Sequence, residues 1–220
     1  MSAADGARIH VRGEELVLLP DRAAYWPARA TLLVADPHFG KAATFRAAAI
    51  PVPAGTTEVT LGRLDALVSR TGARRVVFLG DFLHAHAGRA PATLRAIEGW
   101  RARNGSLEVL LVRGNHDRHA GDPPRELAIE CVDAPAVEPP FALVHYPAPA
   151  AEGYAIAGHL HPAASLVGRG RQATRLPCFW FTAEYAVLPA FGEFTGVATV
   201  EPDPQDRVFV IAEDQVVEVR

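Results

Sequence analysis

The stretch Thr31-Leu32-Leu33-Val34-Ala35-Asp36-Pro37-His38 decides the fold, because its short apolar run leads directly into an aspartate and a histidine. An apolar run without polar alternation is typical of a strand that is buried on both faces of a parallel sheet. Ligands of open α/β sheets bind just beyond the carboxyl ends of such strands, where Asp36 and His38 are placed. A single Asp-x-His pair often occurs by chance, so it is informative only if later strands bring matching residues to the same edge.

Two further apolar runs in the first half of the chain also end in polar residues. Residues 74–79 lead into Gly80-Asp81, and residues 107–112 lead into Arg113-Gly114-Asn115-His116-Asp117. Helices are predicted between these strands, over 42–50, from an N-cap at Thr56 to about residue 69, and from Pro91 to about residue 103. This alternation of strands and helices predicts a parallel sheet.

The second half of the chain predicts a second sheet, mostly antiparallel, because short apolar runs from about residue 129 onward are separated by Gly, Pro and charged turns. Two of these runs end in histidines: His145 follows 141–144, and His159 and His161 follow 154–157. No Gly/Ser/Pro-rich linker separates the halves. We therefore expect residues 1–220 to form a single domain, a two-sheet sandwich with flanking helices.

The composition limits the class of protein. A net charge of −3 excludes a strongly basic protein that coats nucleic acid, although a local basic patch stays possible. The two cysteines, Cys131 and Cys178, form no C-x-x-C motif, so we expect no disulfide framework and a reducing compartment. No signal peptide and no run of roughly 20 apolar residues is visible, so the expected location is cytoplasmic, without membrane contact.

The residues that follow the strands suit a pair of divalent metal ions. They are Asp36, His38, Asp81, Asn115, His145, His159 and His161. Two ions roughly 3.5–4 Å apart can clamp the attacking and leaving oxygens of an in-line displacement at phosphorus. Only two of these residues are carboxylates, so the site would keep a charge near +2, which suits a phosphate. Imidazole, carboxylate and amide ligands fit Mn, Fe or Zn, whereas the absence of thiolates excludes a structural Cys-type zinc site.

In this order the motifs D-x-H, G-D, G-N-H-D, H and G-H-x-H resemble the calcineurin-like metallophosphoesterase superfamily. The resemblance implies an α/β fold, a four-layer α/β/β/α sandwich of two mixed sheets flanked by helices. It implies one metal on Asp36, His38, Asp81 and His161, and a second on Asp81, Asn115, His145 and His159. Asp81 would bridge the two ions. His116 matches the histidine that contacts the phosphate and protonates the leaving oxygen, and Asp117 would orient it.

His84 departs from the superfamily pattern, because it stands where the motif G-D-x-x-D has its second aspartate. The run Gly80-Asp81-Phe82-Leu83-His84, together with Tyr25-Trp26-Pro27 and Leu176-Pro177-Cys178-Phe179-Trp180, resembles the PdeM family of bacterial ligase-associated DNA damage response endonucleases. This resemblance implies a DNA-repair phosphodiesterase that uses manganese, cuts DNA (preferably single-stranded) by attack of a metal-activated hydroxide on phosphorus, and works beside a DNA ligase and a helicase.

Candidates for contacts with a nucleic-acid backbone are mostly arginines. They are His84, Arg89, Arg118, Arg169 and Arg171. Each arginine could equally be a solvated surface residue, and His84 could equally support the metal ligands or face solvent. Two other functions stay open, a phosphodiesterase of small nucleotides or sugar nucleotides and a non-catalytic subunit of a repair complex. The sequence leaves open the identity of the metal, endo- or exonuclease mode, strand preference and oligomeric state.

Overall fold

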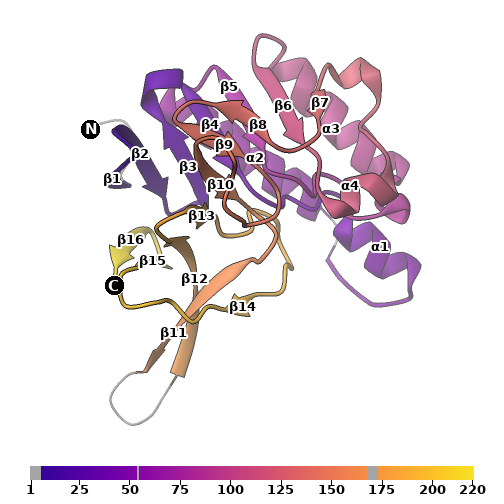
Figure 1. Cartoon of the computed structure of the whole chain (residues 1–220). Coiled ribbons are helices and arrows are strands. Elements are labelled where there is room, and N and C mark those ends of the chain that lie inside the picture. The colour runs from indigo at the N-terminus through magenta and orange to yellow at the C-terminus, as the bar shows by residue number, and fades with distance from the viewer. Residues whose placement is uncertain (1–5, 54, 168–172) are drawn as a thin grey trace.

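A seven-stranded sheet is formed by the first half of the chain in the computed structural model, which describes residues 6–53, 55–167 and 173–220 (Figure 1). In spatial order its strands are β1 (Ala7–Val11), β2 (Glu14–Leu19), β3 (Ala23–Trp26), β4 (Thr31–Val34), β5 (Arg75–Phe78), β6 (Glu108–Val112) and β7 (Glu130–Val132). Strands β1 to β4 pair antiparallel, whereas β4 to β7 pair parallel. The predicted parallel core is therefore confirmed, with an antiparallel extension on one side.

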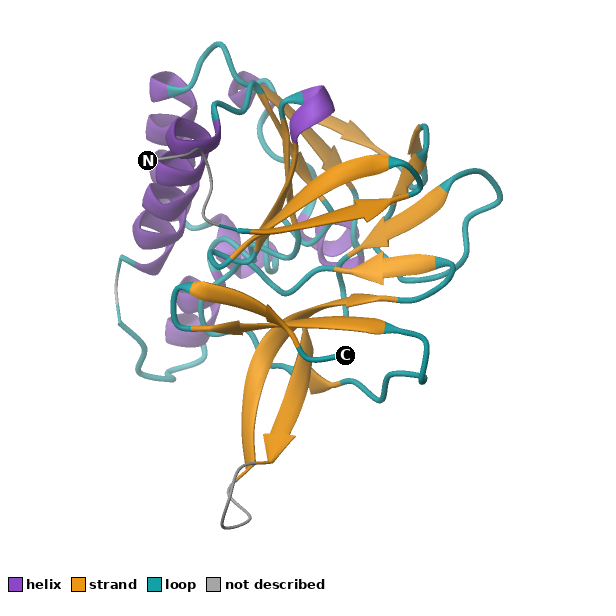
Figure 2. Ribbon diagram, turned by 90° about the vertical axis from the view of Figure 1, so that its left-hand side faces the viewer, coloured by secondary structure: helices purple, strands orange, loops and turns teal. Residues whose placement is uncertain are grey.

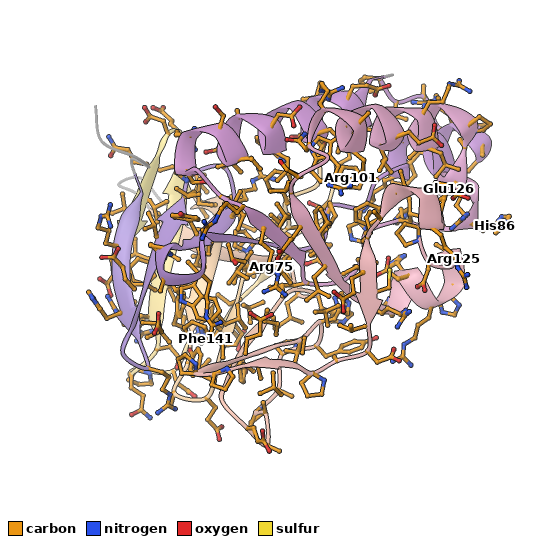
Figure 3. All side chains as sticks on the ribbon, turned by 90° about the horizontal axis from the view of Figure 1, so that it is seen from above. Arg75, His86, Arg101, Arg125, Glu126 and Phe141 are labelled. Carbon is orange, nitrogen blue, oxygen red and sulfur yellow. The ribbon has the colours of Figure 1, made fainter. Side chains whose placement is uncertain are left out.

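Helices α2 (Thr56–Thr71) and α3 (Pro91–Arg103) cover one face of this first sheet. The other helices are α1 (Lys41–Ala47) and α4 (Asn115–Ala120), with 3-10 turns η1 (Pro27–Arg29), η2 (His86–Arg89) and η3 (Arg125–Leu127). Figure 3 shows α2 and α3 lying over the strands, and Leu64 and Trp100 of these helices share one buried core with Phe78 of β5. The N-cap of α2 is Gly55, which is in the left-handed conformation, and not Thr56 as predicted, because Thr56 is already helical.

The second sheet is built around three parallel strands. Its order is β14 (Ala198–Thr199), β11 (Pro162–Val167), β12 (Ala173–Phe181), β13 (Tyr185–Val187), β10 (Tyr154–Ala157), β9 (Phe141–Leu143) and β8 (Ala136–Glu138), and β15 (Arg207–Ala212) joins β12 to β16 (Gln215–Glu218). Strand β10 lies parallel to both β9 and β13, while β12 lies antiparallel to β11, β13 and β15. Strand β7, which the sequence placed in this sheet, instead extends the first sheet beside β6.

The two sheets pack face to face. Leu33 and Val77 of the first sheet share a buried core with Phe141, Ile156 and Phe179 of the second. The α/β fold with two mixed sheets is therefore confirmed. One layer differs from the expectation: in the described part of the chain, helices α1 to α4 all end before residue 121, and Figure 2 shows no helix beneath the strands next to the C-terminus. The segments after residue 129 are short strands without helical periodicity, so they supply no helices to cover the second sheet.

The packing brings the carboxyl ends of β4, β5, β6, β9 and β10 to one edge of the sandwich. Adjacent loops at this edge are joined through their backbones, because His38 N donates to Asp81 O at 3.0 Å and Gly158 N donates to His145 O at 3.1 Å. None of the helices in the described residues is long and apolar enough to cross a membrane.

Candidate dimetal centre

The structure brings the predicted metal ligands together in two adjoining groups. One contains Asp36, His38 and His161, and the other contains Asp81, His145 and His159, with the ligand atoms of each group within 4.8 Å of one another. Asn115 joins the second group, because its Oδ1 lies 2.9 Å from His145 Nε2. The Asp81 carboxylate lies between the groups, with Oδ2 3.8 Å from His38 Nε2 and Oδ1 3.4 Å from His145 Nε2. This is the position that a bridging carboxylate requires.

The hydrogen bonds of the histidines leave nitrogen lone pairs directed into the centre. Nδ1 of His145 donates to Leu79 O at 3.0 Å, and Nδ1 of His161 donates to Gly196 O at 3.0 Å, so Nε2 of each ring is free to bind a metal. Burial lowers the pKa of both histidines, which keeps the rings neutral. His145 Nε2 therefore faces the Asn115 and Asp81 oxygens with its lone pair, and His159 Nδ1 also lies 3.1 Å from it. A cation among these atoms would be bound by several lone pairs at once.

Asp36 gives a second indication that a cation belongs here. Its side chain is fully buried, and its Oδ1 has no hydrogen-bond partner. The other oxygen, Oδ2, accepts a hydrogen bond of 2.8 Å from the backbone N–H of His159. Burial, and then the nearby Asp81 carboxylate, raise the pKa of Asp36 well above its usual range. A bound cation would offset the cost of burying the ionised carboxylate. The donor set therefore fits the divalent ions that the sequence predicts.

Most of these residues have an unusual backbone conformation. Positive φ angles are found at Asp36 (49°), His38 (47°), Asp81 (53°), His159 (71°) and His161 (51°). This left-handed region is uncommon for residues other than glycine, and each instance costs on the order of 1 kcal/mol. Strained backbone is retained where the surrounding structure enforces it, and it collects at functional sites. The strain therefore supports a functional role for the turns that follow β4, β5 and β10.

Two motif glycines allow the backbone to approach the carboxylates. A Cβ atom at Gly158 would lie 2.7 Å from Asp36 Oδ2, and one at Gly114 would overlap the Asp81 carboxylate. Any side chain at these positions would therefore displace a candidate ligand.

His116 stands beside the centre at the start of α4. Its Nε2 lies 3.9 Å from Asp81 Oδ2, and its Nδ1 hydrogen-bonds to the backbone carbonyl of His84. Asp117 does not orient this ring as predicted. Its carboxylate accepts backbone N–H groups of Gly114 at 2.9 Å, Phe82 at 2.9 Å and Leu83 at 3.3 Å. Asp117 therefore ties the turn after β6 to the turn after β5, because a buried carboxylate needs several donors.

His84 lies against the predicted ligands and is half-buried. Its ring stacks on His116, and its Nδ1 lies 3.3 Å from Nδ1 of His38. Burial, with a contribution from the Lys41 ammonium, lowers the pKa of His84 to about 4, so the ring is neutral at pH 7. Of the two positions that the sequence left open for His84, the supporting one is observed.

The predicted backbone-contacting arginines differ in their surroundings. Nη1 of Arg89 lies within hydrogen-bond distance of the carbonyls of Ala120 at 3.2 Å, Gly121 at 3.1 Å and Asp122 at 2.8 Å, so this side of the guanidinium holds the end of α4. Arg118 is exposed, with its guanidinium 3.9 Å from Asp133. Arg169 and Arg171 lie outside the described residues.

One aromatic residue at the centre was not predicted. Tyr146 is exposed and its ring centroid lies 4.5 Å from that of His159. The only signal in the sequence is that Tyr146 follows His145 directly.

Comparison with solved structures places the chain close to a known nuclease. The crystal structure of Pseudomonas putida nuclease MPE is 47% identical, covers 98% of this chain and 100% of its own, and superposes with a TM-score of 0.87. YfcE, a phosphoesterase from E. coli, is 14% identical over 86% of this chain and 97% of its own, with a TM-score of 0.42. No family model matches the chain, and no curated protein matches it.

Proposed function

This chain belongs to the calcineurin-like metallophosphoesterase superfamily, and we propose that it is a metal-dependent DNA phosphodiesterase that cuts single-stranded DNA in DNA repair. The chain is an enzyme that hydrolyses phosphoesters. The observation that carries the proposal is the position of Asp81 between two groups of metal-binding side chains. The nuclease activity named for the Pseudomonas putida relative supports a nucleic-acid substrate.

Two divalent ions would be held by the residues that the sequence assigned to them. The first set is Asp36, His38, Asp81 and His161, and the second is Asp81, Asn115, His145 and His159. When bound, the ions would stabilise charge on the phosphoryl oxygens and make a water molecule a competent nucleophile. We propose manganese, because nitrogen and oxygen ligands without thiolates suit it, although the same set also accepts iron or zinc.

His116 would protonate the oxygen that leaves phosphorus. Its Nδ1 is occupied by the carbonyl of His84, so the remaining nitrogen, Nε2, faces the centre beside Asp81. In its protonated form the imidazole can donate a proton from this nitrogen to the leaving oxygen. Asp117 would fix the position of His116 indirectly, because it accepts the backbone N–H groups of Gly114 and Phe82.

The proposed cellular role rests on the resemblance to the PdeM family. We propose a cytoplasmic enzyme of one domain, residues 1–220, that acts beside a DNA ligase and a helicase. A helicase would supply the single-stranded DNA that the enzyme cuts, and a ligase would seal the ends that repair leaves. Finding genes for both enzymes next to the gene for this chain would support this setting, and co-purification of the three proteins would test it directly.

The substrate is tested with the purified protein loaded with Mn²⁺. Single-stranded DNA, duplex DNA and a small phosphodiester such as bis(p-nitrophenyl) phosphate are compared, with the His116→Ala variant as the control for contaminating nucleases. We expect wild-type protein to cut single-stranded DNA faster than duplex DNA, and the variant to lose this activity. Hydrolysis of the small phosphodiester alone, even at high enzyme concentration, would show that DNA is not the substrate and would favour a small-nucleotide phosphodiesterase.

A further inference from the structure

We propose that Tyr146 is a stacking platform for an unpaired nucleobase next to the phosphodiester that is cut, an inference that rests on the proposed DNA substrate. Tyr146 follows His145 in the turn beyond β9. Its ring centroid lies 4.9 Å from that of His145 and 4.5 Å from that of His159. The ring therefore lies against two of the residues that would hold one of the metal ions, within reach of a nucleotide whose phosphate is bound there.

The ring of Tyr146 is exposed to solvent although it lies beside a buried histidine. Tyr146 is 53% exposed, whereas its neighbour His145 is fully buried. Among the Phe, Tyr and Trp residues that the structure describes, only Tyr146 and Phe194 are classed as exposed. A single exposed aromatic ring is common, but that of Tyr146 lies beside two candidate metal ligands, where its apolar face is available to a bound ligand.

The contacts of Tyr146 also hold its ring in place. The plane of the ring is inclined by 58° to that of His159 and by 72° to that of His145. His145 is fixed in turn by its hydrogen bond to Leu79 O. A ring that is already ordered loses little conformational entropy when a ligand stacks on it, so the platform is prepared before the substrate arrives.

A nucleobase is the part of the proposed substrate that such a platform would recognise. Every base has a π-face, so stacking on an aromatic ring strengthens binding without requiring a particular sequence. Bases in a duplex are already paired and stacked, and they are not available to the ring. A stacking platform at Tyr146 therefore gives a physical cause for a preference for single-stranded DNA.

The alternative is that Tyr146 only supports His159 and His145. A supporting residue would affect all substrates alike, because it acts through the metal ligands. A stacking residue would affect only substrates that carry bases. These two roles are separated by comparing an ordinary single-stranded oligonucleotide with one of the same length in which tetrahydrofuran replaces every base.

The Mn²⁺-loaded protein is assayed on both oligonucleotides. For the wild type we expect kcat/KM to be about tenfold higher on the oligonucleotide with bases, mainly through a lower KM. Tyr146→Phe should keep this ratio, because it keeps the ring. Tyr146→Leu should bring the ratio close to one, because it keeps apolar bulk against His159 but removes the π-face. A ratio that is unchanged in the leucine variant, or a wild-type ratio of one, would overturn the proposal.

Binding gives a second readout that does not depend on activity. The two oligonucleotides, labelled with fluorescein, are titrated with each protein in EDTA and followed by fluorescence anisotropy. Loss of the base preference in Tyr146→Leu alone supports stacking, even if this variant also loses metal, and an unchanged preference contradicts it. If the wild type cuts neither oligonucleotide but hydrolyses bis(p-nitrophenyl) phosphate, the DNA substrate itself is wrong. If it cuts both equally, only the stacking proposal fails.

Discussion

The imidazole ring of His116 lies nearly parallel to that of His84, with ring centroids 4.9 Å apart and planes inclined by 21°. The backbone carbonyl of the same His84 holds Nδ1 of His116. One residue therefore positions the proposed proton donor in two ways, through its main chain and through its side chain. Substitution of His84 removes only the second of these contacts.

This difference predicts unequal losses of activity. His116→Ala should lower kcat by about 100- to 10,000-fold, because it removes the group that protonates the leaving oxygen. His84→Ala should lower kcat by only about tenfold, since the carbonyl that orients His116 remains. Cleavage of single-stranded DNA with Mn²⁺ measures both effects, because the alkoxide that leaves from DNA depends on protonation far more than p-nitrophenolate does. His86→Ala is the matched control, because His86 lies two residues away and is exposed. Equal losses in the first two variants would show that His84 takes a direct part in the reaction.

The place of Asp81 between the two groups predicts different metal contents. Asp81→Ala should abolish both metal sites, whereas His38→Ala should mainly weaken the one that it shares with Asp36 and His161. Elemental analysis of the dialysed, Mn²⁺-loaded proteins gives the number of ions per chain. His119→Ala, at an exposed histidine of α4, serves as the control. The same metal content in the wild type, Asp81→Ala and His38→Ala would refute the assignment of ligands.

Arg89 is predicted to stabilise the fold and not to bind substrate. Arg89→Ala should lower the free energy of unfolding by about 1–3 kcal/mol, because three backbone carbonyls lose a charged donor. Arg118→Ala should change it by less than about 0.5 kcal/mol, since Arg118 is exposed and its ion pair is weak. Urea unfolding measures both values. If Arg89→Ala instead raised the KM for DNA and left the free energy of unfolding unchanged, Arg89 would contact the substrate, as the sequence suggested.

The buried thiol of Cys178 is expected to make the folded protein less stable in alkaline solution. Burial in β12 raises the pKa of its thiol from 9.0 to about 12. The unfolded chain releases this proton near pH 9, whereas the folded chain keeps it to about pH 12, so the contribution to stability is complete below pH 9 and is lost above it.

This contribution is measured by comparison with Cys178→Ala. The difference in the free energy of unfolding between wild type and variant should fall as the pH rises above 9, at up to about 1.4 kcal/mol per pH unit. Urea titrations at several pH values follow the change. Cys131→Ala is the control, because the Cys131 thiol is only half-buried. For this variant the difference in the free energy of unfolding from wild type should fall less with pH. Parallel pH profiles for wild type and Cys178→Ala would show that the thiol does not titrate as expected.

The strands and the candidate ligands could be predicted because both are encoded locally. The run before Asp36 is apolar without interruption, and a residue just after such a strand must emerge at the sheet edge. Pairing between distant segments is not encoded locally. The sequence therefore placed β7 in the wrong sheet, and it predicted helices over the second sheet that the described residues do not contain.

Side-chain partners were the least predictable part of the site. Asp117 is adjacent to His116, but its carboxylate turns to backbone N–H groups of Gly114, Phe82 and Leu83, which only the folded chain brings near. Arg89 lies among carbonyls that α4 presents after folding. Each of these charged side chains is buried or half-buried and therefore needs hydrogen-bond partners. Its partners come from segments that are adjacent only in the folded chain, so the sequence does not reveal them.

The left-handed backbone at Asp36, His38, Asp81, His159 and His161 makes the loss of this centre easier than its gain. Replacement of Asp36 or Asp81 by glycine removes a ligand and relaxes the main chain at that position, so a descendant that abandons catalysis has a short route to losing the centre. Acquisition has no such short route, because a side chain grafted onto a relaxed turn would point elsewhere. Selection for the reaction must therefore act continuously to preserve these turns, and transplanting the centre into another protein requires the loops as well as the ligands.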